Sequence, residues 1–316
     1  MAARILDGNK IREQIMSELA GEIRELKAAG ITPGLAAVLV GQNPASQIYV
    51  RNKVKTCQSL GLYSEKIEMP SSATAGDLLK QVDQLNRRDD VDGILIQLPL
   101  PPQVDAAAAL EAVDPAKDVD GLHPVNMGYL MSGRPCLAPC TPAGVVEILR
   151  RSQIVLAGAR ALVIGRSNLV GKPLAMLLLR EHATVTIAHS KTRELPALAR
   201  QADILVGAMG KPAFVTAEFI KPGATVIDVG INRLSTAEEI RRLYHDPSEP
   251  LRRLEAKGAV LVGDVQPEDV REKAGAFTPV PGGVGPLTIA MLMVNTVRAA
   301  ARRRAVRTQN GLACEK

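Results

Sequence analysis

Three side chains that can share or move protons stand at helical spacing near the N-terminal third of the chain. Ser46, Tyr49 and Lys53 occupy positions i, i+3 and i+7, in a stretch that begins with Pro44. Proline suits the first turn of a helix, and this spacing puts a hydroxyl, a phenol and an amine on one helix face. The arrangement is typical of acid–base chemistry, although a solvated lysine on an amphipathic helix has the same spacing.

The elements that must position these groups alternate between helix and strand, which predicts an α/β protein with parallel sheets. A length of 316 residues predicts two domains. Besides the helix that carries Lys53, predicted helices cover residues 8–29, 75–87, 104–113, 144–151, 174–181 and 287–304. Predicted strands cover residues 35–40, 64–69, 93–98, 160–164, 183–188, 204–207, 225–229 and 260–262.

A glycine-bounded turn, Gly165 to Gly171, follows the apolar strand 160–164 and precedes a helix. A nucleotide pyrophosphate binds at such a turn, where backbone N–H groups face the ligand. Ser167 replaces the second glycine of the usual Gly-x-Gly-x-x-Gly pattern, so a purely structural turn remains the alternative. The strand-turn-helix context nevertheless favours a dinucleotide site.

The end of the following strand indicates which dinucleotide binds. An NAD site usually places a carboxylate there, to accept hydrogen bonds from the ribose hydroxyls. This chain instead has Ser190, Lys191 and Arg193, with no carboxylate before Glu194. A hydroxyl and cations suit a ribose phosphate, and Arg166 can approach it from the first turn. We therefore expect NADP rather than NAD.

Composition excludes several other classes. Aromatic residues make up only 2% of the chain, which argues against a single-strand nucleic-acid binder. The net charge of +6 includes a C-terminal run of arginines at 302, 303, 304 and 307, which we interpret as a solvated helix end or tail. The four cysteines lack zinc-ligand spacing and predict reduced thiols. We expect no metal and no membrane span, since no apolar run of about 18 residues is present.

Several segments together resemble one family along nearly the whole chain, in order. The bifunctional methylenetetrahydrofolate dehydrogenase/methenyltetrahydrofolate cyclohydrolase family is similar to this sequence in residues 43–53, 93–101, 117–124, 139–142, 165–173 and 279–286. The resemblance implies an α/β fold with an N-terminal catalytic domain, a Rossmann-like NADP-binding domain with a parallel sheet, and an active site in the cleft between them. The implied folate-binding domain is 1–140 with the C-terminal helix 287–316, and the implied cofactor domain is 141–286.

The resemblance also implies the chemistry. The family oxidises 5,10-methylenetetrahydrofolate with NADP and then hydrolyses the methenyl product to 10-formyltetrahydrofolate, in one-carbon metabolism that serves purine biosynthesis. It implies a metal-free, cytoplasmic homodimer acting on tetrahydrofolate derivatives, polyglutamylated forms included, without nucleic-acid or membrane partners. A dehydrogenase that lacks the hydrolytic step is the alternative among enzymes. A non-catalytic NADP-binding regulator is the alternative outside them.

The family's functional residues match positions of this sequence one by one. The matched catalytic residues are Lys53, Tyr49, Gln97 and Asp120. The matched substrate-binding residues are these four with Ile96, Leu98, Pro281, Gly282, Gly283, Val284 and Gly285. The matched cofactor-binding residues are Gly165, Arg166, Ser167, Ser190 and Ile231.

Elementary chemistry agrees with these roles. A lysine that is desolvated beside a cationic substrate gives up its proton more readily, and Tyr49, one turn away, could bond the Lys53 amine. A Gln97 amide can bridge water and the amine, and Asp120 can accept paired N–H donors from an aminopyrimidine. One stretch departs from the family: residues 235–258 are longer than its usual connection, and we expect one or two extra surface helices there.

Overall fold

The structure is a computed structural model, and it describes residues 3–305. The chain divides into two compact units. Within the described residues, unit 1 comprises residues 3–12 with Thr141–Thr288, and unit 2 comprises Glu13–Cys140 with residues 289–305. Of the three points where the chain passes from one unit to the other, two fall inside long helices, α1 (Gly8–Ala28) and α12 (Val284–Ala305), and the third falls at the start of α6 (Cys140–Arg151).

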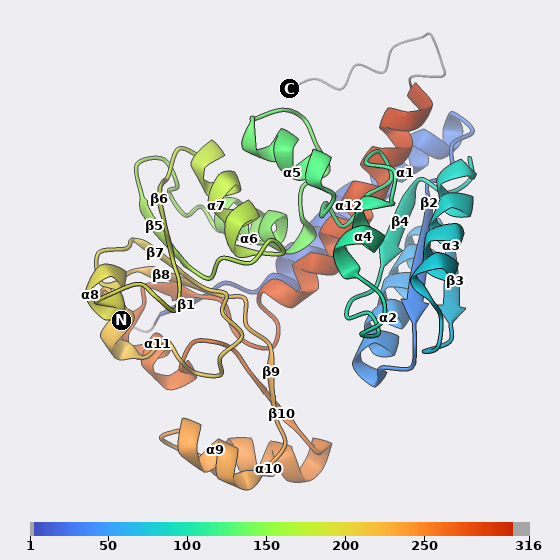
Figure 1. Cartoon of the computed structure of the whole chain (residues 1–316). Coiled ribbons are helices and arrows are strands. Elements are labelled where there is room, and N and C mark those ends of the chain that lie inside the picture. Colours follow the sequence, from blue (N-terminus) through green and yellow to red (C-terminus); the bar gives the residue numbers. More distant parts are fainter. Residues whose placement is uncertain (1–2, 306–316) are drawn as a thin grey trace. The chain divides into compact units, whose positions relative to one another are not determined.

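The core of unit 1 is a six-stranded parallel sheet (Figure 1). Its strands, in spatial order, are β1 (Arg4–Ile5), β11 (Ala276–Phe277), β8 (Thr225–Asp228), β7 (Ile204–Gly207), β5 (Arg160–Ile164) and β6 (Thr184–Ala188). The order reverses at β5, because the chain continues first to β6 on one side and then to β7 on the other. Ligands of open α/β sheets bind outside the carboxyl ends of the strands at such a reversal.

The division into compact units differs at the N-terminus from the domain boundary that we expected at residue 1. Residues 3–12 group with unit 1, because β1 pairs in parallel with β11 at Arg4↔Ala276 and Ile5↔Phe277. Two-residue strands carry no readable periodicity, so the sequence offers no sign of this pairing.

Helices complete unit 1. They are α6 (Cys140–Arg151), α7 (Gly171–Arg180), α8 (Leu195–Ala199), the 3-10 helix η1 (Ala217–Phe219) and α11 (Pro267–Lys273). Apolar side chains from the strands, α8, η1 and α11 form one buried cluster that includes Leu162, Leu205 and Val226. This burial makes the strands rigid supports for the turns that follow them.

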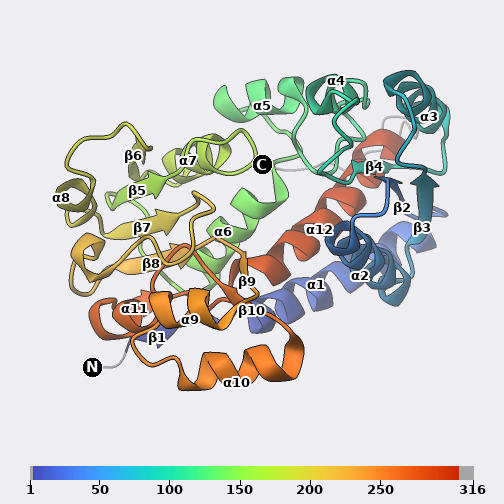
Figure 2. The same cartoon turned by 60° about the horizontal axis from the view of Figure 1, so that its bottom comes forward.

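Two helices are present within residues 235–258, where we expected one or two. They are α9 (Ala237–Leu243) and α10 (Ser248–Lys257), between strands β9 (Asn232–Leu234) and β10 (Val260–Val262). Figures 1 and 2 show both helices at the end of this two-stranded ribbon. We expected residues 260–262 among the parallel strands, and this is wrong: β10 pairs antiparallel with β9 in a sheet of its own.

Unit 2 has a three-stranded parallel sheet in the order β3-β2-β4. Its strands are β2 (Gly34–Val40), β3 (Tyr63–Met69) and β4 (Gly93–Ile96), and its helices besides α1 and α12 are α2 (Pro44–Leu60), α3 (Ala75–Arg87), α4 (Ala106–Glu111) and α5 (Pro124–Met131). All seven residues of β2 are buried, as expected for a central parallel strand covered on both faces. The chain after β4 is therefore held at one edge of a rigid sheet.

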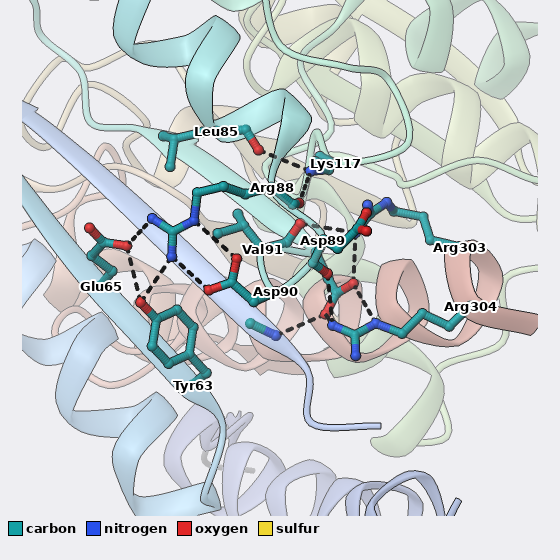
Figure 3. Close-up of polar contacts among 12 residues, drawn as sticks. Tyr63, Glu65, Leu85, Arg88, Asp89, Asp90, Val91, Lys117, Arg303 and Arg304 are labelled. Carbon is teal, nitrogen blue, oxygen red and sulfur yellow. Dashed lines mark hydrogen bonds and ion pairs between the residues drawn. The ribbon is translucent and has the colours of Figure 1, made fainter. Parts of the chain in front are cut away.

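The arginine run at the end of α12 is not solvated as we expected. Asp92 is fully buried, and its carboxylate accepts hydrogen bonds from Arg303 Nη1 at 2.7 Å and Arg304 Nη2 at 3.0 Å (Figure 3). Asp92 also accepts from the backbone N–H of Gly34 at the start of β2. A buried carboxylate needs such partners to replace lost hydration. These arginines therefore tie the end of α12 to the sheet of unit 2, while Arg307 lies outside the described residues.

α12 is also the one helix in the described part of the chain that is long and apolar enough to cross a membrane. Within its most apolar window, 67% is buried inside the protein. Because the core helix of a globular protein has the same composition, the burial explains the apolar run.

Candidate active site

Lys53 lies on the inner face of α2 and is only 8% exposed. The helix begins with an Asn43 side-chain cap that accepts from the Ser46 N–H, followed by Pro44. The Lys53 Nζ donates to Gln97 Oε1 at 3.0 Å, and the Gln97 Nε2 donates to the carbonyl of Leu98 at 2.7 Å. The amine is thus held at the carboxyl end of β4 by a neutral amide that is itself held in place.

Tyr49 does not hold the amine, contrary to our hypothesis. Its side chain is 44% exposed, and among the described residues the amine's hydrogen-bond partner is Gln97. The predicted stripe is therefore divided: Ser46 and Lys53 face inward, with Ser46 Oγ 3.5 Å from the Leu98 carbonyl, while the phenol faces outward.

Asp120 and Lys53 both lie near the buried Cys140 thiol. Burial raises the pKa of the Cys140 thiol, the nearby Asp120 carboxylate adds to this increase, and the charge of Lys53 opposes it. Cys140 also bonds the Asp120 side chain and approaches the Val119 carbonyl at 3.2 Å. Within unit 2 the structure therefore brings together Lys53, Gln97, Leu98 and Asp120. Ile96 is next to them along β4, but its side chain is 2% exposed and belongs to the core.

Two buried charged residues before Asp120 were missed by sequence reasoning. Lys117 is 1% exposed, and its Nζ donates to the carbonyls of Leu85, Asn86 and Arg88 at 2.9, 2.8 and 2.6 Å, where α3 ends. Figure 3 shows Lys117 beside Leu85 and Arg88. The ammonium thus adds a donor to three carbonyls at the C-terminal end of α3, one of which, Leu85, also accepts from the Arg88 N–H.

Asp118 secures the other side of this segment. Its carboxylate accepts from the N–H groups of Leu122 and His123 and from Asn126 Nδ2. Its backbone pairs with Ile94 of β4 as an isolated parallel bridge. Asp120 therefore projects from a segment that is anchored before and after it. One feature of the sequence could have indicated these two buried charges: a lysine directly precedes an Asp-x-Asp sequence in a strand-like segment.

The glycine-rich segment 281–285 lies in unit 1 and is closely packed. A Cβ on Gly283 would lie 2.6 Å from the Pro279 carbonyl oxygen, and Gly282 has a φ of +102°. Larger residues would therefore clash at Gly283 and be strained at Gly282. Gly285 is near Ile231, since its Cβ would lie 3.7 Å from Ile231 Cδ1. Val284 is buried, whereas Pro281 is exposed.

The turn after β5 fits a dinucleotide. Gly165 has a φ of +142°, and a Cβ on Gly171 would lie 2.1 Å from the Gly165 carbonyl oxygen. No side chain caps the first turn of α7. The Lys172 N–H donates to the Ser167 carbonyl and Pro173 has no N–H, so the N–H groups that suit an anion are those of Gly171 and the turn before it. Ser167 Oγ accepts from the Val170 N–H at 3.1 Å and orders the turn.

The residues expected to select NADP lie at neighbouring strand ends. Arg166 follows β5 and Ser190 follows β6, and both are exposed. The Gly165 N–H donates to the carbonyl of Ala188, which fastens these two strand ends together. A second bond, from the His189 N–H to Thr192 Oγ1, orders the turn after β6. The positions suit a phosphate on the adenosine ribose.

The fold and these features define an NAD(P)-dependent enzyme of two α/β units. Family models match both parts of the chain: the catalytic domain of tetrahydrofolate dehydrogenase/cyclohydrolase over residues 6–120, and its NAD(P)-binding domain over residues 139–304.

Individual relatives agree. Bifunctional protein FolD from Koribacter versatilis (strain Ellin345) is 60% identical over 304 residues, which cover 96% of this chain and 99% of the relative. A crystal structure of the bifunctional FolD enzyme from Campylobacter jejuni has a TM-score of 0.86 at 42% identity, covering 96% of this chain and 100% of that one.

A third relative carries the cofactor. The Trypanosoma brucei enzyme, solved with NADP and an inhibitor, has a TM-score of 0.86 at 39% identity and covers 98% of this chain and 100% of that one. This chain belongs to the tetrahydrofolate dehydrogenase/cyclohydrolase family. It is an NADP-dependent methylenetetrahydrofolate dehydrogenase and a methenyltetrahydrofolate cyclohydrolase.

Lys117 makes stability depend on pH. Burial lowers its pKa from 10.5 to about 8, with the charge of Arg303 adding and those of Asp114 and Asp92 opposing. Between pH 8 and 10.5 the unfolded chain keeps a proton that the folded protein has released, so this residue makes the free energy of unfolding rise with pH. In urea unfolding, Lys117→Met should lose this rise, which is at most about 1.4 kcal/mol per pH unit.

The matched control is Lys80→Met, an exposed lysine on α3. The free energy of unfolding of Lys80→Met should change with pH in the same way as that of the wild type between pH 8 and 10.5. Because other titrating groups cancel in the comparison, a constant difference between wild type and Lys117→Met from pH 8 to 10.5 would contradict the assignment.

Proposed function

We propose that Lys53 and Gln97 form the hydrolytic centre of this bifunctional enzyme. The observation that carries the proposal is the buried Lys53 amine bonded to a neutral amide at the carboxyl end of β4. No carboxylate among the described residues ion-pairs with this amine, so its charge is not locked by a partner. An amine in this setting can exchange a proton with water or substrate.

The hydrolytic step follows from this geometry. Water adds to the electrophilic carbon of the methenyl bridge, and Lys53 takes the proton that the water loses. The resulting adduct carries a hydroxyl on that carbon, and opening of the bond to N5 leaves the formyl group on N10. The same lysine returns a proton to N5 as the bond breaks. The hydroxyl of the adduct loses its proton as it becomes the formyl oxygen, so one proton is released overall. Gln97 keeps the amine oriented through both transfers.

Asp120 binds the pterin in this proposal. Its carboxylate can accept two N–H donors from the aminopyrimidine edge, a planar match that single donors cannot provide. The support is its anchored segment and its shared contact with Cys140 near Lys53. Tyr49, exposed on α2, offers a flat surface and a phenol to the substrate instead of to the lysine. Ile96 and Leu98 contribute through the end of β4.

The dehydrogenase step uses residues of unit 1. NADP, when bound, accepts the hydride from the methylene bridge. The turn Gly165–Gly171 with Ser167 holds its pyrophosphate at the start of α7, and Arg166 and Ser190 bind the ribose phosphate. Ile231 and the segment 281–285 line the same unit's binding surface.

We also propose a cytoplasmic homodimer that accepts polyglutamylated folates. The support is the family resemblance, and a net charge of +6 favours an anionic polyglutamate tail. Sedimentation at assay concentrations should give the mass of two chains, and a mass of 33.6 kDa would contradict the dimer.

A dehydrogenase without hydrolysis is disfavoured by the intact Lys53–Gln97 pair.

Replacing Lys53 separates the two activities. Lys53→Met keeps the length of the side chain and removes its proton exchange, so hydrolysis of methenyltetrahydrofolate should fall by about 10²–10⁴-fold. Hydride transfer does not need that proton and should fall far less. Both rates are measured on one preparation, by loss of methenyl absorbance and by NADPH formation.

The control is Lys55→Met, an exposed lysine on the same helix, which should leave both rates within about twofold of the wild type. Hydrolysis that survives in Lys53→Met at the wild-type rate would sink the proposed centre, whatever the dehydrogenase does.

A further inference from the structure

A fully buried carboxylate in unit 1 has no part in the chemistry described so far. Asp264 follows β10 and is 0% exposed. Its Oδ2 accepts from the N–H groups of Met209 and Gly210 at 2.6 and 2.8 Å. Its Oδ1 accepts from the Lys211 N–H at 2.8 Å and from Asn232 Nδ2 at 3.0 Å. Four donors replace the water that the carboxylate has lost, and three of them are consecutive backbone groups.

A second carboxylate holds the first in place. Asp228, at the end of β8, accepts from the N–H groups of Gly230, Asp264 and Val265 at 3.0, 2.8 and 2.9 Å. The fit is tight: a Cβ on Gly263 would lie 1.8 Å from Asp228 Oδ2, and a Cβ on Gly230 would lie 2.3 Å from Asp264 Oδ1. Glycine alone allows the two strand ends and the two carboxylates to approach this closely.

The segments that the two carboxylates hold lie at the carboxyl edge of the parallel sheet. Residues 208–211 directly follow β7, and residues 229–232 directly follow β8. The first of these segments abuts the cofactor turn, since a Cβ on Gly165 would lie 2.2 Å from the Ala208 carbonyl oxygen. The second contains Ile231, which lies near Gly285.

The order of the strands indicates in which direction a bound dinucleotide extends along the carboxyl edge of the sheet. With the pyrophosphate at the turn after β5, and the adenosine ribose at the end of β6, the other half of a dinucleotide extends toward β7 and β8. That half carries the nicotinamide, where the hydride arrives. The segments held by Asp264 and Asp228 are on this side.

We propose that Asp264 is a positioning residue for hydride transfer, because with Asp228 it fixes the backbone of residues 209–211 and 230–232 against which the nicotinamide half of NADP is placed. The inference rests on the cofactor site at Gly165–Gly171. It concerns how precisely the nicotinamide is oriented, and it leaves the adenosine half and the hydrolytic centre unaffected.

Asp264→Asn tests the proposal. The amide keeps the size of the side chain, but its Nδ2 faces backbone donors, so at least one of the N–H groups of residues 209–211 loses its acceptor. The kcat/KM for NADP reduction should fall about 100-fold, as expected for a small misplacement of reacting groups. Affinity for NADP should fall about tenfold, because the binding segment is no longer preorganised.

Two readouts should not change. Hydrolysis of methenyltetrahydrofolate, assayed without NADP, should stay within about twofold of the wild type because Lys53 and Gln97 are intact. Calorimetric binding of adenosine 2′,5′-bisphosphate, which carries only the adenosine end, should also be retained. The matched control is Asp269→Asn, whose carboxylate accepts from the Ala217 N–H at the start of η1, and this variant should keep both activities.

Asn232→Ser provides a milder change, since it leaves the carboxylate unaltered and removes an amide that donates to Asp264 Oδ1 at 3.0 Å and to the Gly263 carbonyl at 3.2 Å. This variant should also lose hydride transfer while it keeps hydrolysis and adenosine 2′,5′-bisphosphate binding, but the loss should be smaller. If Asp264→Asn does not fold, this variant serves as the test of the proposal. Equal losses in both activities, or a loss of adenosine 2′,5′-bisphosphate binding that matches the loss of NADP binding, would overturn the proposal. So would unchanged hydride transfer in folded Asp264→Asn.

Discussion

A buried amine must have an acceptor, and in unit 2 the acceptor for Lys53 is the amide of Gln97. This one hydrogen bond joins the inner face of α2 to the carboxyl end of β4, so it fixes where the reactive nitrogen lies relative to a rigid sheet. A carboxylate in the same place would hold the lysine as a permanent ion pair. A neutral amide satisfies the buried group and leaves its proton available. The hydrolytic half of the reaction depends on that difference.

The same requirement, that buried polar groups find partners, organises the rest of the site. Lys117 closes the end of α3 and carries the segment that presents Asp120. The Asp264 carboxylate accepts hydrogen bonds from three backbone N–H groups beside the cofactor turn. In each case a charge stands next to a strand end or a helix end, where backbone groups lack partners. These residues set geometry for the chemistry, and none of them needs to touch the substrate.

Local patterns predicted much of this arrangement and missed its long-range parts. Helical spacing placed Ser46 and Lys53 on one face, and the strand-turn-helix pattern located Gly165–Gly171, because both depend on neighbours in sequence. The pairing of β1 with β11, the antiparallel pairing of β10 and the burial of Lys117 join residues that are distant in sequence, so no local pattern marks them. Tyr49 shows a further limit: spacing gives a shared face, but burial decided that Gln97 and not the phenol meets the amine.

The most direct test of this account is a double-mutant cycle on Lys53 and Gln97, read from kcat/KM for methenyltetrahydrofolate hydrolysis. If the amine and the amide act as one unit, Gln97→Met should lower hydrolysis on its own but have little further effect in a Lys53→Met background. A coupling energy of about 1–3 kcal/mol is then expected. Additive losses, with a coupling energy near zero, would contradict the claim that the Lys53–Gln97 hydrogen bond organises the hydrolytic centre.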